Sequence, residues 1–225
     1  MTLAWPEINS ALILTGLEGA AVLVSAIAGM ILAANKRMDI VGAFALACLN
    51  AFGGGTIRDL LLDNRPFYWV AHWEYLVAIL VICVPFVYSV RIFRLATEVH
   101  RRSVKMDALG LALFTVAGVG IALKHDAPLV VAPLMGALTG TAGGVLRDVV
   151  VNEVPDLFRP GALYATASFF GAVAFMAALE HGLRYGEAAI VGVVVVFLLR
   201  VGSLHLGVTV PKPLWIEGEE ERRPP

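Results

Sequence analysis

Charged residues are scarce in this chain, and positive and negative charges nearly balance. Asp, Glu, Lys and Arg make up 16% of the 225 residues, hydrophobic residues make up 59%, and the formal net charge is -1. This composition excludes an ordinary soluble globular domain, because several apolar runs of about 18 residues or more must lie in lipid. The near-zero net charge also argues against a nucleic-acid partner.

The residues that usually carry catalysis or bind metals are also sparse. The two cysteines, Cys48 and Cys83, lie inside apolar runs, so no disulfide is expected. The five histidines are scattered and form no HxxxH or HExxH motif, so we expect no metal site and no resident cofactor. The sequence offers no nucleophile–base pair that would indicate an enzyme. Lys and Arg are absent before Lys36, so we expect the first apolar run to be a membrane span rather than a cleavable signal.

The apolar runs predict an all-α polytopic membrane protein with seven transmembrane helices in one membrane domain, residues 1–225. The predicted helices cover about 11–33, 40–62, 74–93, 107–123, 129–151, 161–180 and 187–206. Residues 207–225 are rich in proline and charge, so we expect a flexible cytoplasmic tail.

Lys and Arg are unevenly distributed between alternate connectors, which predicts the orientation in the membrane. One side holds Arg65, Lys124 and Arg184; the other holds Lys36, Arg37, Arg91, Arg94, Arg101, Arg102, Lys105, Arg159 and the tail residues Lys212, Arg222 and Arg223. The positive-inside rule therefore places the amino terminus outside and the carboxyl terminus in the cytoplasm. The membrane that we expect is a bacterial inner membrane.

Two parts of the chain repeat each other. Residues 25–66 and 114–155 align without a gap at an offset of 89, with 11 identities in 42 positions. We expect a three-helix unit at 11–93 and a second at 107–180, with the helix at 187–206 outside both. Because three is an odd number of spans, the second unit should be inverted relative to the first.

Glycines recur at equivalent places in the two copies. Gly53, Gly54 and Gly55 lie within the second predicted helix, and Gly143 and Gly144 follow Ala142 in the fifth. Interrupted helices at matched positions of inverted repeats are typical of a permeation or binding site. We predict that these glycines break both helices and line the pathway; the alternative is that they allow close helix packing.

An Arg-Asp pair follows the glycines in each copy, as Arg58-Asp59 and Arg147-Asp148. Adjacent residues on a helix point about 100° apart, so we expect pairing across the repeats, Arg58 with Asp148 and Arg147 with Asp59. Such pairs would form a charged constriction on each side of the glycines. The alternative is a static ion-pair clasp that holds the halves together.

Other polar residues at membrane depth are secondary candidates for the pathway. Glu18 lies within the first predicted helix, where it either pairs with an arginine or sits near the interface. We interpret it as having no counterpart acid in the second copy, because Asp107 begins the fourth helix. Asn50, Thr56, Thr139 and Thr141 flank the glycines, although such hydroxyls often bond to their own helix.

Four segments resemble the prokaryotic members of the trimeric intracellular cation channel family, also described as glycine-transporter-like. They are KRMDIVGA (36–43), GGGTIRDLLL (53–62), DALGLALFTVAG (107–118) and AGGVLRDV (142–149). The resemblance implies seven helices, a homotrimer in membrane lipid, and a potassium-type cation pore within each protomer, formed by kinked second and fifth helices. A conducted K⁺ or Na⁺ would be the bound ion. Two departures are Ala142, in place of a third glycine, and Ala28, in place of a frequent serine.

The charges themselves leave the solute open. Half-helix amino termini and arginines favour an anion or a zwitterion, whereas carbonyl ends and aspartates favour a cation. A transporter of glycine or another small zwitterion therefore remains the alternative to a channel.

Overall fold

The computed structural model describes residues 8–89, 100–159 and 163–208, and the regular elements in these ranges are helices. They are α1 (Ile8–Asn35), α2 (Ile40–Leu61), α3 (Tyr68–Ala71), α4 (Glu74–Tyr88), α6 (His100–Lys124), α7 (Val131–Val150), α8 (Ala165–Glu180) and α9 (Tyr185–Leu206). Apart from α3, a single turn, each coincides with one predicted membrane helix. The all-helical class is therefore confirmed for the described residues, while most of the predicted tail and residues 90–93 lie outside them.

Four helical stretches are long and apolar enough to cross a membrane: Ala11–Asn35, Ile40–Leu61, Lys105–Lys124 and Tyr185–Leu206. Two shorter apolar helices, α4 and α8, have 15 and 16 residues. The number of membrane crossings remains a prediction.

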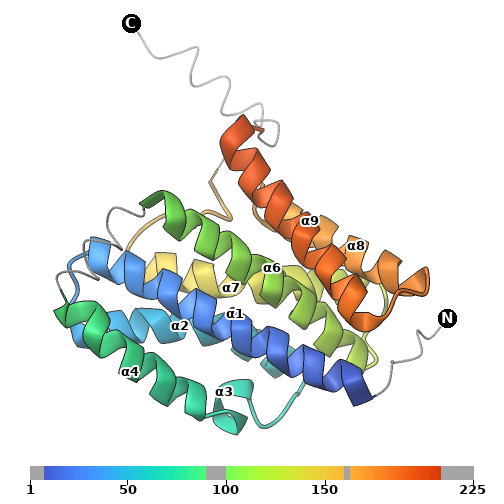
Figure 1. Ribbon diagram of the computed structural model, residues 1–225, viewed down its shortest axis with the longest axis horizontal. Coiled ribbons are helices and arrows are strands. Elements are labelled where there is room, and N and C mark those ends of the chain that lie inside the picture. Colours follow the sequence, from blue (N-terminus) through green and yellow to red (C-terminus); the bar gives the residue numbers. More distant parts are fainter. Residues whose placement is uncertain (1–7, 90–99, 160–162, 209–225) are drawn as a thin grey trace, which may run out of the picture.

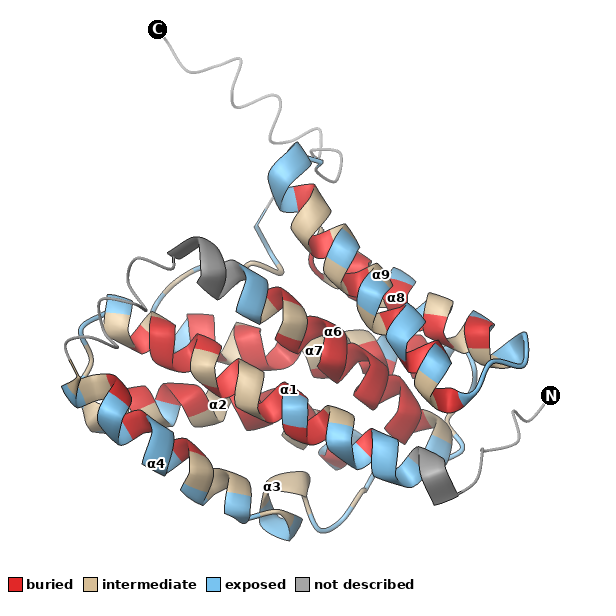
Figure 2. Cartoon of the chain, viewed as in Figure 1, coloured by how far each residue is buried: buried red, intermediate tan, exposed pale blue. Residues whose placement is uncertain are grey.

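Helix α6 lies at the centre of the bundle. It packs on α1, α7, α8 and α9, while α2 packs on α1, α4 and α7. Figure 1 shows α3 and α4 on one flank and α8 and α9 on the other. The middle of α6 is almost entirely buried, as the run of red in Figure 2 shows. Small residues such as Ala112, Ala117 and Ala122 make this possible, because they let neighbouring helices approach closely.

The outer surfaces of the flanking helices are apolar. Val77, Val81 and Val84 on α4 are exposed, and so are Ile190 and Leu198 on α9. A helix that turns such side chains outward is suited to lipid, where its backbone hydrogen bonds are already made internally.

Matching helix ends occur in the two halves. Asp63 and Asn152 follow α2 and α7 with φ of 50° and 57°, and Arg37 and Asp126 follow α1 and α6 with φ of 55° and 54°. The members of each pair are 89 residues apart. Positive φ is uncommon outside glycine, so its recurrence at equivalent positions shows that the two halves share these backbone turns.

The predicted helix breaks are absent. Helix α2 runs without interruption through Gly53, Gly54 and Gly55, and α7 runs without interruption through Gly143 and Gly144. The sequence prediction was wrong because glycine lowers helix propensity by only about 1 kcal/mol, which tertiary packing readily overrides.

Candidate functional site

The glycines lie where α2 and α7 cross. A Cβ atom on Gly54 would fall on the carbonyl oxygen of Thr139, and a Cβ on Gly143 would lie 2.5 Å from the carbonyl oxygen of Asn50. A Cβ on Gly53 would lie 3.4 Å from the Cα of Gly143. The two backbones are therefore in direct contact, in an antiparallel arrangement, and these positions require glycine for packing. Gly55 is different, because the nearest atom to a Cβ there would be the Nη2 of Arg58 at 3.8 Å. A Cβ on Gly144 would lie 2.8 Å from the Tyr164 hydroxyl, which is a side-chain atom rather than backbone.

The first charged cluster joins α1 to the end of α2. Arg58 Nη2 lies 2.6 Å from Glu18 Oε1 and 2.6 Å from Asp59 Oδ1, and Arg58 Nε donates to the same Asp59 oxygen at 2.9 Å. Asn64 Nδ2 also donates to Asp59 Oδ1, at 3.0 Å, and the backbone N–H of Tyr68 donates to Asp59 Oδ2 at 3.2 Å. We call Glu18, Arg58 and Asp59 the first triad; it is sealed from solvent, with the Arg58 side chain 0% exposed.

The second charged cluster repeats this arrangement on α6 and α7. Arg147 Nη1 lies 2.8 Å from Asp107 Oδ1, and Arg147 Nε donates to Asp148 Oδ1 at 2.8 Å. The backbone N–H of Asp156 donates to Asp148 Oδ2 at 3.4 Å. We call Asp107, Arg147 and Asp148 the second triad. Its arginine and acids are 10 to 14% exposed, so it is less tightly sealed than the first.

The structure corrects the predicted pairing across the repeats. Each arginine bonds to the aspartate that follows it on its own helix, and the second acid comes from α1 or α6. The helical angle between neighbours did not forbid this, because the long arginine side chain can fold back toward the next residue. An acid on the adjacent helix then holds the guanidinium between two carboxylates.

The interpretation that Glu18 lacks a counterpart was also wrong. Asp107 lies 89 residues after Glu18, the offset that relates Arg58 to Arg147 and Asp59 to Asp148. Asp107 bonds to Arg147 as Glu18 bonds to Arg58. Of the two alternatives for Glu18, pairing with an arginine is confirmed.

The remaining predicted polar candidates make local bonds. The hydroxyls of Thr56, Thr139 and Thr141 each donate to the carbonyl oxygen four residues earlier on their own helix. Asn50 instead joins two helices, donating from Nδ2 to the carbonyl oxygen of Ser25 at 2.7 Å. These bonds satisfy polar groups inside the bundle. Among the described residues, no group of three or more His, Cys, Asp or Glu could hold a metal ion.

A pocket of about 270 Å³ adjoins the first triad. Its polar lining residues are Thr15, Glu18, Arg58, Asn64, Arg65, Tyr68, His72, Lys124 and His125. Burial raises the pKa of the Tyr68 hydroxyl well above its ordinary value, so Tyr68 stays neutral. Arg65 and Lys124 bring positive side chains to the lining of this pocket.

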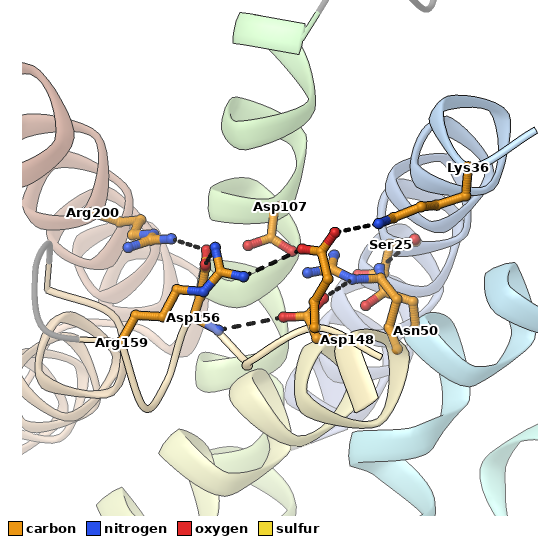
Figure 3. A network of polar contacts seen from close by, with 10 residues as sticks. Ser25, Lys36, Asn50, Asp107, Asp148, Asp156, Arg159 and Arg200 are labelled. Atoms are coloured by element: carbon orange, nitrogen blue, oxygen red, sulfur yellow. Dashed lines mark hydrogen bonds and ion pairs between the residues drawn. The ribbon is translucent and has the colours of Figure 1, made fainter. Parts of the chain in front are cut away.

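A network of ion pairs surrounds the second triad. Lys36 at the end of α1 bonds to Glu153, and Arg159 Nη2 lies 3.3 Å from Glu153 Oε2. Arg159 Nη1 also lies 3.8 Å from Asp156, which accepts from Arg200 Nη2 at 2.9 Å. Figure 3 shows Lys36, Asp107, Asp148, Asp156, Arg159 and Arg200 converging from α1, α6, α7, α9 and the loop after α7.

Sequence reasoning missed all five members of this network, Lys36, Glu153, Asp156, Arg159 and Arg200, as well as Asp107. Arg200 is a charge inside an apolar helix, and Asp107 satisfies the offset of 89, so both carried a readable signal. Lys36 and Glu153 lie in connectors, where charge is ordinary, and only the tertiary structure brings them together.

Comparisons with known proteins agree with this architecture. The family model described as "Glycine transporter" matches residues 16–91 and again 104–181. The chain is 36% identical to a UPF0126 membrane protein of Vibrio cholerae over 204 residues, which is 90% of this chain and 83% of that protein. It is 35% identical to the UPF0126 inner membrane protein YadS of Escherichia coli K12 over 194 residues, 84% of this chain and 90% of that protein.

A solved structure matches the fold as well. The trimeric intracellular cation channel orthologue from Rhodobacter sphaeroides superposes with a TM-score of 0.78 and 35% identity, covering 87% of this chain and 99% of that one. The chain belongs to the trimeric intracellular cation channel family. Since the family model matches twice, once in each half, this family's sequence unit corresponds to one copy of the repeat seen at offset 89.

Proposed function

We propose that this protein is a monovalent cation channel of the potassium type, with a pathway inside each protomer beside the α2–α7 crossing. The observation that carries the proposal is the pair of equivalent buried triads, each placed one helical turn beyond the crossing glycine on its helix. Because α2 and α7 are antiparallel at Gly54 and Gly143, the triads lie toward opposite ends of the crossing. Charges at membrane depth are costly, and they are typically kept where ions or polar solutes pass.

The four carboxylates of the triads supply cation-binding oxygens along this pathway. The formal charge of each triad is -1, since two acids face one guanidinium. A transient K⁺ or Na⁺ ion would be attracted by that charge at each end. The related structure from Rhodobacter sphaeroides carries the name of a cation channel, which supports the same interpretation.

The assembly proposed is a homotrimer in the bacterial inner membrane. The relative from Rhodobacter sphaeroides is named trimeric, and that from Escherichia coli is named an inner membrane protein. We further propose two inverted three-helix repeats plus α9, with the amino terminus outside. The matched turns, the matched triads and the double match to the family model support the duplication.

A second candidate is a transporter of glycine or another small zwitterion. The pocket beside the first triad favours it, because Glu18 offers a carboxylate for an ammonium group while Arg58 and Lys124 offer cations for a carboxylate. The description of the matching family model agrees with this class of solute.

Reconstitution of the purified protein separates the two candidates. In planar bilayers under a KCl gradient, a channel gives unitary current steps that reverse near the K⁺ equilibrium potential. A carrier gives saturable uptake of labelled glycine into liposomes without such steps. Glycine uptake without unitary currents would contradict the channel and support the transporter.

The alternative interpretation is that the triads are a static clasp, which only holds the two halves of the protein together. Arg147→Gln separates the two interpretations, because a triad on the pathway should change reversal potential or open probability when its charge changes. A clasp would lower thermal stability and leave selectivity and gating as in the wild type.

A further inference from the structure

A second pocket, of about 370 Å³, lies where the end of α1, the start of α2 and the end of α4 meet. Its apolar lining residues are Met30, Ala34, Met38, Ala43, Phe86 and Val87. Among the described residues that line it, Arg37 is the only charged one. The pocket therefore combines an apolar interior with a single cation.

The second half of the molecule contains the equivalent place, and there it is filled. The offset of 89 relates the six apolar lining residues to members of one packed cluster: Val119, Leu123, Ala127, Ala132, Phe175 and Met176. Helix α9 contributes Tyr185, Ala188 and Ala189 to that cluster. The Tyr185 ring meets Phe175, the equivalent of Phe86, with ring centroids 5.5 Å apart.

Helix α9 has no counterpart in the first half. It begins at Tyr185, after both matches to the family model. Helix α8 packs on α6, α7 and α9, whereas α4 packs on α1 and α2, the equivalents of α6 and α7. Figure 1 shows α9 beside α8, with α4 on the opposite flank of the bundle. Within the described residues, no helix takes the place against α4 that α9 takes against α8, so the pocket is left uncovered.

The membrane supplies what the fold does not. An apolar cavity does not retain water, and an empty one loses the dispersion contacts of its lining. Arg37 lies in the turn after α1, a helix long enough to cross the membrane, so the pocket opens close to the membrane–water interface. Hydrocarbon chains and charged headgroups meet at that depth.

The Arg37 guanidinium is available to a headgroup. Arg37 is exposed and forms no ion pair with any other described residue. Its neighbours in the turn are already engaged, because Lys36 bonds to Glu153 and Asp39 accepts from the backbone N–H of Gly42 at 2.8 Å. Arginine binds phosphate oxygens well, since its planar fork can donate two parallel hydrogen bonds.

We propose that this pocket binds an anionic phospholipid, with one acyl chain among the apolar lining residues and the phosphate on Arg37. The chain takes the place that Tyr185 and its neighbours on α9 take in the second half. Arg37 lies on the side predicted to be cytoplasmic, where anionic lipids attract basic residues. This inference goes beyond the proposed function and does not depend on which solute the protein conducts.

Lipid titration followed by native mass spectrometry tests the proposal. The purified full-length protein, delipidated in detergent, is titrated with dioleoyl phosphatidylglycerol or dioleoyl phosphatidylcholine. The wild type should bind its first phosphatidylglycerol about fivefold more tightly, the factor expected for one basic residue beside an anionic headgroup. Arg37→Gln should lower that affinity to the value for phosphatidylcholine, and Arg37→Lys should retain most of it. Equal affinities of the wild type for the two lipids overturn the proposal.

Lys36→Gln is the matched control. It removes a positive charge one position from Arg37, but Lys36 bonds to Glu153 and does not line the pocket. Its preference for phosphatidylglycerol should stay near the wild-type value. An equal loss in Lys36→Gln and Arg37→Gln would show a general attraction of the basic turn for anionic lipid and overturn the site.

A variant that fills the pocket tests the acyl chain separately. Ala34 is half-buried and lines the pocket, so Ala34→Phe places a ring there, as Tyr185 is placed beside Phe175 in the second half. The variant should lose the tight site for both lipids. Unchanged lipid binding overturns the proposal, and if the same spectra also show loss of an oligomer, a second copy of the chain occupies the pocket instead. Because binding is measured without current, failure of the proposed channel function would leave this result unaffected.

Discussion

Asp107 is the structural counterpart of Glu18: each carboxylate lies within 2.8 Å of a terminal guanidinium nitrogen of the arginine on the neighbouring helix. The two acids stand on α1 and α6, the first helix of each half, and the arginines on α2 and α7. The duplicated feature is thus a three-residue charge cluster built from two helices rather than an Arg-Asp dipeptide alone. Each half therefore depends on one arginine to stabilise two neighbouring carboxylates.

Removing Arg58 should be among the most damaging single changes. Arg58→Ala strands the carboxylates of Glu18 and Asp59 inside the bundle, and the loss of one partner from a buried ion pair costs about 3–5 kcal/mol. In a double-mutant cycle, Glu18→Ala and Arg58→Ala should couple by about 1–3 kcal/mol in detergent unfolding experiments.

The same cycle distinguishes this pairing from pairing across the repeats. Arg58 and Asp148 belong to different triads, so the stability losses of Arg58→Ala and Asp148→Ala should add within about 0.5 kcal/mol. Strong coupling between Arg58 and Asp148, with none between Arg58 and Glu18, would contradict the structure.

The glycines at the crossing should not tolerate even a methyl group. Gly54→Ala and Gly143→Ala would each push a Cβ against a backbone carbonyl oxygen of the facing helix, which cannot move aside as a side chain would. We expect overpacking costs of about 1–3 kcal/mol in thermal unfolding and reduced conductance.

Gly202→Ala is the control for that comparison. Gly202 lies in α9, and a Cβ added there would have no neighbouring atom within 4 Å. Alanine at this position should therefore be neutral or stabilise the helix by up to about 1 kcal/mol. Equal losses at Gly202 and Gly54 would show that the crossing has no special requirement.

The Glu153 ion pairs should depend on pH in a defined direction. The hydrogen bond from Lys36, with Arg159 nearby, lowers the Glu153 pKa below its usual value of 4.5. Because the folded-state pKa is depressed, the stabilisation is fully present above the unfolded-state value and is lost as pH falls through the folded-state value. The melting-temperature difference between wild type and Glu153→Gln should therefore be constant from neutral pH down to about pH 5.

Below that range the difference should shrink, as the protonated Glu153 of the wild type comes to resemble glutamine. The neighbouring acid Asp156 is the same in both proteins, so the subtraction removes its contribution. A difference that disappears already between pH 6 and 7 would contradict the lowered pKa.

The predicted orientation can be tested separately. A reporter fused after Pro225 should be active only in the cytoplasm, because alternate connectors carry Lys and Arg on that side. Arg65 and Lys124, assigned to the outer side, do line one pocket together with the first half of α1. Periplasmic activity of the reporter would show that the orientation is the opposite of the one predicted, and the outer and inner ends of the proposed pathway would then be exchanged.

The sequence alone determined the helical class, the helix positions, the duplication and the charged residues, because apolar length, helix periodicity and internal identity are all local or pairwise properties of the chain. The partners of those charges were decided by the tertiary structure. Arg58 could reach Asp59, Glu18 or Asp148, and only the packing of α1 against α2 selects the first two. The role of Gly54 was also decided by the tertiary structure. Its low helix propensity predicted a helix break, whereas its contact with Thr139 shows that it allows α2 and α7 to cross closely. Lys36 and Glu153 lie 117 residues apart in connectors, and their pairing exists only because the fold brings two helix ends together.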